Sequence, residues 1–228
     1  MHYTVKTAGD QSIIIYFGEQ ISKQTSQTVQ KLSNIIESSG IIGVEEVILG
    51  YTTILIHYAP TRISFHTLIN TIKAIIMDVD LAKTDERNTI EIPVLYGEEL
   101  GPDLANVARL NNLSEQEVIK LHTEPDYTVY FLGFSPGFPF LGGLDERIAT
   151  PRLENPRKKV QAGSVGIANH QTGIYPVTSP GGWQIIGHTP IPLFNPSDDN
   201  PFLLSPGDII TFKPITKIEY DEIINSQI

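Results

Sequence analysis

Residues 130–144 read Tyr-Phe-Leu-Gly-Phe-Ser-Pro-Gly-Phe-Pro-Phe-Leu-Gly-Gly-Leu. This aromatic segment places four phenylalanines within ten positions, around two glycines, and one turn cannot bury all four rings in its own core. Its Ser135-Pro136-Gly137 favours a type II turn, because proline presets φ and glycine accepts positive φ. Two interpretations stay open: the rings plug the end of a β-barrel, or they line an apolar pocket for a ring-shaped ligand.

Glycine and proline are concentrated around the aromatic segment. Residues 133–207 hold 11 of the 18 glycines and 11 of the 16 prolines in this chain of 228 residues. Dense glycine and proline with short apolar runs between them predict tight turns and short strands, as in a β-barrel or a β-sandwich. The last of three Ser-Pro-Gly tripeptides in the chain, Ser205-Pro206-Gly207, needs only a structural explanation as a turn.

The N-terminal part alternates strand-like and helical patterns. Apolar residues recur at three- and four-residue steps over 22–38, and again after Ser64, which can cap a helix. Strand-like runs cover 13–17, 44–49, 52–58 and 88–95. The resulting order, β-α-β-β-α-β, is that of a ferredoxin-like domain. Because no cluster of reactive side chains falls in it, we expect a structural or docking module.

The predicted fold class is therefore α+β, in two domains. A ferredoxin-like domain covers residues 1–90, and a domain of short strands, a β-barrel or a β-sandwich, covers residues 91–228. Two short helices are expected where the second domain begins, the first from Pro102 and the second opened by a capping box of Ser114 and Glu117.

The composition excludes several classes of function. Sixteen Lys and Arg against 26 Asp and Glu give a net charge of −10, which repels phosphate backbones and acidic lipids, so we expect neither nucleic-acid binding nor membrane docking. The chain has no cysteine for a disulfide or a thiolate metal site, and its six histidines show no metal-ligand spacing. Without a visible targeting segment or membrane-spanning run, we expect a cytoplasmic protein.

The second Ser-Pro-Gly precedes the only tryptophan of the chain, in Ser179-Pro180-Gly181-Gly182-Trp183. Adjacent glycines leave their backbone N–H groups accessible, and such donors can hold a carboxylate, a phosphate or a developing oxyanion. The alternative is a tight turn whose tryptophan fills the barrel.

Basic residues cluster between Asp145 and Lys159, where five Lys and Arg face three Asp and Glu. Two of the arginines follow prolines, in Pro151-Arg152 and Pro156-Arg157. A rigid proline fixes where each guanidinium emerges, and the guanidinium fork suits bidentate contact with a carboxylate or phosphate. A solvated basic loop is the alternative.

Together these motifs resemble one family, the KipI family, also called the 5-oxoprolinase B subunit or allophanate hydrolase subunit 1. The resemblance is carried by residues 133–144, 151–152, 156–157, 162–165, 171–176 and 179–183, with Gly187 and Thr189-Pro190. It implies a ferredoxin-like N-terminal domain and a cyclophilin-like β-barrel. The chain departs from the family at one edge of the expected groove, with Gln161 where the family usually has Pro and Lys158 where it commonly has Thr.

The resemblance also implies partners and an activity. A KipA-like protein, equivalent to the 5-oxoprolinase C subunit, would bind this chain, and a protein like the A subunit would complete the complex. Members of the family take part in cleaving 5-oxo-L-proline to L-glutamate, with ATP hydrolysed to ADP and phosphate. ATP would act at the assembled complex, and we expect the chain to be inactive alone.

The residues that this reaction needs are taken from the motifs. Phe134, Phe138 and Tyr175 would form an apolar slot for the lactam ring, Arg152 or Arg157 would bind its carboxylate, and Ser179 with the backbone of Gly181 and Gly182 would donate to developing charge. The catalytic candidates are Ser179, Arg152 and Arg157. The substrate-binding candidates are Phe134, Phe138, Gln161, Tyr175, Gly181, Gly182 and Trp183.

Two other functions are alternatives. A KipI-type protein would inhibit a histidine kinase and be antagonised by the KipA-like partner, since aromatic and arginine residues also form protein-binding hot spots. A carboxyltransferase-like role on urea-derived substrates would need biotin, and the chain has no biotin-attachment motif.

Overall fold

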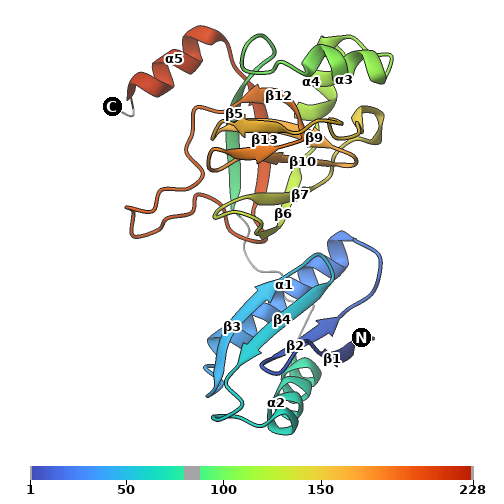
Figure 1. Cartoon of the computed structure of the whole chain (residues 1–228), viewed down its shortest axis with the longest axis vertical. Coiled ribbons are helices and arrows are strands. Elements are labelled where there is room, and N and C mark those ends of the chain that lie inside the picture. Colours follow the sequence, from blue (N-terminus) through green and yellow to red (C-terminus); the bar gives the residue numbers. More distant parts are fainter. Residues whose placement is uncertain (1, 80–87, 227–228) are drawn as a thin grey trace. The chain divides into compact units, whose positions relative to one another are not determined.

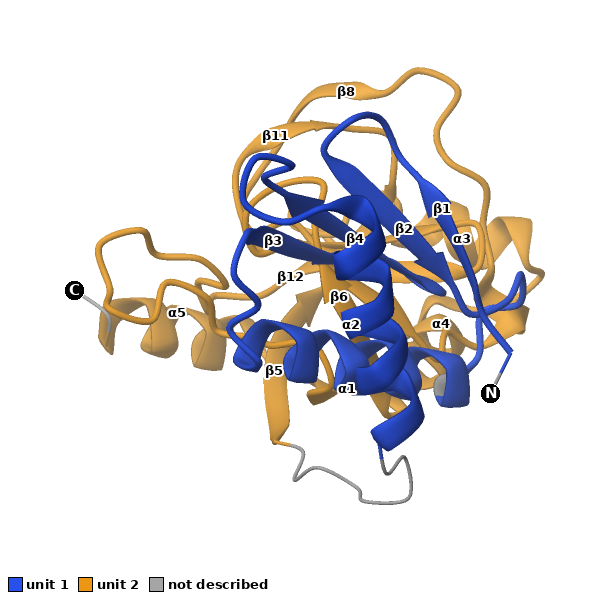
Figure 2. Ribbon diagram, turned by 90° about the horizontal axis from the view of Figure 1, so that it is seen from below, with its two compact units in different colours: residues 1–86 blue, residues 87–228 orange. Residues whose placement is uncertain are grey.

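The chain divides into two units, residues 1–86 and 87–228, and the computed structural model describes residues 2–79 and 88–226 of them (Figure 2). Each unit has a separate hydrophobic core. None of the helices within these described ranges is long and apolar enough to cross a membrane.

The first unit is an antiparallel sheet with two helices (Figure 1). Within residues 2–79 its elements are β1 (Thr4–Thr7), β2 (Ser12–Tyr16), α1 (Lys23–Ser38), β3 (Val44–Leu49), β4 (Thr53–Tyr58) and α2 (Phe65–Asp78). The strand order is β1-β2-β4-β3. Ile13 and Ile15 of β2 and Ile54 of β4 are fully buried, and they share a core with Leu32 of α1 and Leu68 of α2.

Both predicted helices of this unit are confirmed. The Ser22 hydroxyl accepts a hydrogen bond from the Thr25 N–H at 3.1 Å, and the Ser64 hydroxyl accepts one from the Thr67 N–H, also at 3.1 Å. These N-caps satisfy backbone donors that the first turn of each helix leaves without a partner.

The predicted ferredoxin-like order is wrong in its last strand. Residues 88–95, expected as the last strand of this domain, form β5 (Thr89–Tyr96) in the second unit, where Ile92 and Val94 are fully buried. An edge of the sheet is instead formed by β1, which pairs with β2 from Thr4↔Tyr16 to Thr7↔Ile13. A short polar strand gives no hydrophobic alternation, so the sequence pattern did not reveal it.

The second unit contains a closed β-barrel, which confirms the barrel over the sandwich. Within residues 88–226 its strands are β5, β6 (Tyr127–Leu132), β7 (Pro139–Gly142), β9 (Ser164–Ala168), β10 (Gln171–Ile174), β12 (Gln184–His188) and β13 (Ile209–Pro214). They close in the order β10-β7-β6-β13-β5-β12-β9. The pair of β5 and β13 is parallel and the other ladders are antiparallel. The finer likeness to a cyclophilin stays a prediction.

Smaller elements surround the barrel. They are α3 (Leu104–Leu110), α4 (Glu115–Thr123), the 3₁₀ turn η1 (Glu146–Ile148), a two-stranded sheet of β8 (Arg157–Val160) and β11 (Ser179–Gly181), and α5 (Lys217–Ser226). The capping box of Ser114 and Glu117 is confirmed in both of its hydrogen bonds. Helix α3 begins two residues later than predicted, with Asp103 rather than a residue before Pro102 at its N-cap.

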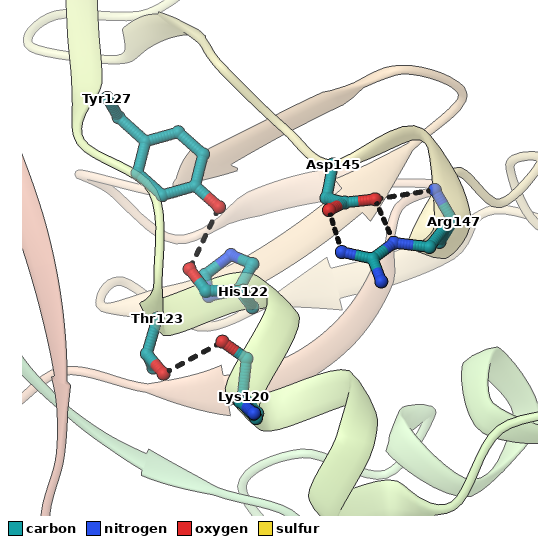
Figure 3. Close-up of polar contacts among 6 residues, drawn as sticks. All are labelled: Lys120, His122, Thr123, Tyr127, Asp145 and Arg147. Carbon is teal, nitrogen blue, oxygen red and sulfur yellow. Dashed lines mark hydrogen bonds and ion pairs between the residues drawn. The ribbon is translucent and has the colours of Figure 1, made fainter.

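A buried histidine joins α4 to the barrel. The Tyr127 hydroxyl donates to the His122 carbonyl oxygen at 2.8 Å (Figure 3). Thr172 Oγ1 donates to the Gly166 carbonyl at 3.1 Å, so it accepts from His122 Nε2 at 2.8 Å. His122 Nδ1 then accepts from the Tyr96 hydroxyl at 2.7 Å. Burial lowers the pKa of His122 to about 3, and the ring is neutral in the folded chain.

We expect this histidine to make the barrel unit sensitive to acid. In the unfolded chain His122 binds a proton once the pH is below its ordinary pKa of 6.5, whereas in the folded chain it stays neutral down to about pH 3. The free energy of unfolding therefore falls as the pH falls from 6.5 toward 3. From pH 6.5 to about 5 the loss is about 2 kcal/mol. Denaturant unfolding followed by Trp183 fluorescence should therefore show a steeper pH dependence in the parent than in His122→Gln. Equal slopes in the two proteins would contradict this account.

Candidate functional site

One pocket in the barrel unit brings together the three segments that stand out in the sequence. It has a volume of about 260 Å³. Its lining residues come from the aromatic segment (130–144), from the Pro-Arg segment (151–157) and from the tryptophan segment (179–183). They are Phe134, Phe138, Phe140, Arg152, Pro156, Pro180, Gly181, Gly182 and Trp183. Six of the ten predicted site residues are among them.

Buried aromatic rings form the base of the pocket. Phe138 is only 2% exposed, and its ring meets Trp183 and Tyr175 edge to face, with centroids 5.5 and 5.7 Å apart. Such pairs are favoured by the quadrupoles of the rings and fix their relative orientation. The two interpretations of the aromatic segment therefore combine, because Phe138 belongs to a buried cluster and also lines the pocket. Tyr175 belongs to the cluster but is not a lining residue.

The three Ser-Pro-Gly tripeptides differ in structure. The first and third are the predicted turns: Phe138 N–H donates to the Ser135 carbonyl at 3.1 Å, and Asp208 N–H donates to the Ser205 carbonyl at 3.1 Å. For the second, the turn prediction is wrong. Ser179–Gly181 is strand β11, which pairs with β8 through a register shift.

Gly181 has a packing role instead of a turn role. It does not adopt a positive φ, but a Cβ at this position would overlap the hydroxyl of Tyr175. Ser179 is not a lining residue, and its hydroxyl oxygen is buried with no hydrogen-bond partner among the described residues. Gln161 is exposed and also lies outside the lining.

Arg152 is the cation of the pocket. Its Cζ lies 6.0 Å from the centroid of the Trp183 ring, within range of a cation–π contact. Among the described residues it forms no ion pair with a carboxylate. Its backbone is held on both sides, because Pro151 O accepts from Gln184 Nε2 at 2.9 Å and Leu153 N–H donates to Gly182 O at 2.7 Å. The guanidinium of Arg152 therefore remains able to bind an anion.

The two other arginines of the basic cluster are already paired. Arg157 Nη2 lies 2.7 Å from Asp103 Oδ1, and Arg157 is not a lining residue. Arg147 binds both carboxylate oxygens of Asp145, and these hydrogen bonds lower the pKa of Asp145 to about 2 (Figure 3). The basic cluster thus contributes one arginine to the pocket. Within the described ranges, no group of three His, Asp or Glu side chains is arranged to hold a metal ion.

Sequence reasoning missed the partner of Arg157. From the sequence, Asp103 is only a residue near the start of a short helix, yet its side chain is buried and paired 54 positions away. No local pattern signals such a long-range pair. Phe140, Pro156 and Pro180 are also absent from the predicted site, although each lies inside one of the motifs that point to it.

Phe134 forms the outer edge of the pocket. Its side chain is 80% exposed, its ring lies 5.9 Å from that of Phe138, and its φ is +66°. A bulky residue in this left-handed region is strained, and such strain is concentrated at functional sites. The backbone of Phe134 is thus strained, and burial of its ring within this chain does not offset that strain.

Two substitutions of Phe134 should separate the energetic cost of its positive φ from the contribution of its aromatic ring. We expect Phe134→Gly to be more stable than Phe134→Ala by about 1 kcal/mol, because glycine accepts positive φ and alanine keeps the clash of its Cβ. Denaturant midpoints of the two variants measure the difference directly. Alanine equal to or better than glycine would mean that the backbone here is not strained.

Comparisons with known proteins place the chain in a family. The family model described as "Carboxyltransferase domain, subdomain C and D" matches residues 3–204. A Bacillus subtilis protein, named as the B subunit of 5-oxoprolinase, is 43% identical over 230 aligned positions, which cover 96% of each chain. An Escherichia coli O157:H7 protein of the same name is 57% identical over 129 positions, 57% of this chain and 59% of that protein.

A solved structure has the same fold. The crystal structure of TTHA0988 matches with a TM-score of 0.81 and 34% identity, over 90% of this chain and 40% of that chain. This chain therefore spans about two-fifths of that longer protein. The resemblance drawn from the motifs is confirmed, and this chain belongs to the family of the carboxyltransferase domain, subdomain C and D.

Proposed function

We propose that this chain is the B subunit of a 5-oxoprolinase, an assembly that opens the ring of 5-oxo-L-proline with hydrolysis of ATP. The observation that carries the proposal is the pocket, in which an arginine with no carboxylate partner among the described residues lies over an aromatic wall. A five-membered lactam with a carboxylate presents the complementary surface, one apolar ring and one anion. The names of the Bacillus subtilis and Escherichia coli relatives give the same function.

The reaction converts 5-oxo-L-proline, ATP and water to L-glutamate, ADP and phosphate. A lactam is a stable amide, so its carbonyl must be activated. Transfer of the terminal phosphoryl group of ATP to the amide oxygen releases ADP. One water then attacks the ring carbon and the C–N bond breaks, which leaves the free amine and an acyl phosphate, and a second water hydrolyses the acyl phosphate to the carboxylate and phosphate. In this proposal Arg152 holds the ring carboxylate, while Phe134, Phe138 and Trp183 hold the ring. The backbone of Gly181 and Gly182 faces the same pocket and supplies donors for charge on the amide oxygen.

The size of the pocket favours the small substrate over the nucleotide. Drug-sized ligands occupy pockets of about 300–1,000 Å³, and this one has about 260 Å³. We therefore assign ATP to another component of the complex, with proteins like the A and C subunits of 5-oxoprolinase as partners. The cytoplasm, which supplies ATP, is the location that suits this function. Activity would require the complete assembly.

Four predicted site residues do not line the pocket. Two of them support it indirectly in this proposal: Arg157 is bound to Asp103, and Tyr175 lies in the cluster around Phe138. Ser179 and Gln161 lie outside the lining, and their contacts with substrate stay predictions. The histidine-kinase inhibitor is not favoured by the names of the relatives.

Reconstitution tests the proposed activity. We expect the chain, co-purified with partners like the A and C subunits, to release glutamate from 5-oxoproline only when ATP is present. The chain alone should release none, because we expect the site to be completed by the partner subunits. Glutamate release can be followed with a coupled enzymatic assay. An assembled complex that releases no glutamate would reject the proposal and restore the kinase-inhibitor alternative.

Arg152 should be the arginine that matters for substrate. We expect Arg152→Ala to lower kcat/KM for 5-oxoproline by about 10- to 100-fold, the equivalent of about 1.5–3 kcal/mol for a lost charge-assisted hydrogen bond. Arg147→Ala is the matched control, since it removes an arginine that is paired with Asp145 outside the pocket. Equal turnover in the parent and Arg152→Ala would eliminate the pocket as the carboxylate site.

A further inference from the structure

Helix α3 begins at a buried carboxylate that does not cap it. Asp103 is 7% exposed and occupies the N-cap position, but its side chain makes no capping hydrogen bond. Its Oδ1 instead accepts from Arg157 Nη2 at 2.7 Å, and its Oδ2 accepts from the Ile185 N–H at 2.6 Å. Its own N–H donates to the Ile185 carbonyl at 2.8 Å. Asp103 thus links α3 to β8 and β12 at once.

A second polar link runs from the same helix. Asn106 Nδ2 donates to Gln184 Oε1 at 3.0 Å, and Gln184 Nε2 donates to the Pro151 carbonyl at 2.9 Å. Gln184 is 3% exposed, so its amide has left water and depends on these two partners. Arg109 Nη2 donates to Asn106 Oδ1 at 2.8 Å and orients the amide. We call Asp103, Asn106, Arg157 and Gln184 the α3 clamp.

The α3 clamp ends on residues next to the cation and the tryptophan of the pocket. Pro151 immediately precedes Arg152, and Gln184 and Ile185 immediately follow Trp183. Arg157 Nη1 also reaches toward the Trp183 carbonyl, at 3.5 Å. The clamp therefore holds the backbone next to Arg152 and next to Trp183, the two residues of the cation–π contact.

We propose that Asp103 and Gln184 are positioning residues, which place the Arg152 guanidinium over the Trp183 ring. They thereby set the affinity of the pocket for a carboxylate-bearing ring, a ligand that rests on the proposed function. Stability alone does not account for the clamp, because the Asp103–Arg157 ion pair is only partly buried and even fully buried ion pairs are often no more stabilising than apolar residues of similar volume. Its value lies in geometry, since displacing a binding group by about 1 Å can cost about 100-fold in rate.

The first test removes the charge of Asp103 and keeps its shape. Asp103→Asn retains an acceptor for the Ile185 N–H but loses the ion pair to Arg157. We expect a shift in Trp183 emission and easier quenching by acrylamide, read in the full chain without any ligand, because Trp183 is the only tryptophan. In the reconstituted complex, KM for 5-oxoproline should rise about 10-fold with little change in kcat. Asp145→Asn, which breaks the Asp145–Arg147 pair outside the pocket, should leave both readouts unchanged.

The second test separates positioning from stability. In the double variant Asp103→Asn/Arg157→Met, the ion pair is removed while an acceptor for the Ile185 N–H is kept, and the denaturant midpoint should return from that of Asp103→Asn toward that of the parent. We expect the altered Trp183 signal and the raised KM to persist. Recovery of all three properties together would overturn the proposal, because the clamp would then be only a stabilising contact.

The outcomes distinguish this inference from the proposed function. If Asp103→Asn leaves Trp183 emission and quenching as in the parent, the clamp does not position the pocket, whatever the activity of the complex. If the Trp183 signal changes while KM stays constant, the clamp is supported and the pocket is rejected as the substrate site.

Discussion

The barrel unit depends on how closely three aromatic rings can approach one another. Phe138, Tyr175 and Trp183 meet at near right angles, and the backbone beside them has no room for side chains. A Cβ at Gly173 would lie 3.0 Å from the Phe138 ring, and one at Gly181 would overlap the Tyr175 hydroxyl. Gly173 and Gly181 therefore leave space for these rings. The same packing gives the pocket its rigid base.

Polar side chains decide what that base can bind. Three arginines emerge from one short stretch, yet Asp145 and Asp103 occupy two of them, and of the three only Arg152 has no carboxylate partner among the described residues. The difference lies in their partners and not in the residue type. An aromatic wall alone would accept many apolar groups, whereas a wall with one available guanidinium selects for an anion attached to a ring.

The sequence predicted the features that rest on local patterns. Helices α1 and α2 follow from apolar periodicity, with Ser64 as the predicted cap of α2. Glycine and proline density indicates a barrel or a sandwich, and the family resemblance favours the barrel. Features that rest on distant pairing were not predictable. The apolar pattern of β5 suits either sheet, so it does not show that the strand belongs to the barrel. A turn is one of the two interpretations that Ser179–Gly181 allows, and the local sequence gives no sign of the ladder to β8 that rules it out. The pairing of Asp103 with Arg157 was missed for the same reason.

The parallel pair of β5 and β13 has a consequence for how the chain is made. Asn88, just before β5, meets Asp208, which the ribosome adds 120 residues later. Among the described residues, the sheet of the first unit is complete once β4 has emerged. In the barrel, however, β5 is flanked by β12 and β13, which are both synthesised much later than β5. Until then β5 has two open edges, which are templates for pairing with the wrong strand. High contact order slows folding, so we expect the barrel to fold more slowly than the N-terminal sheet.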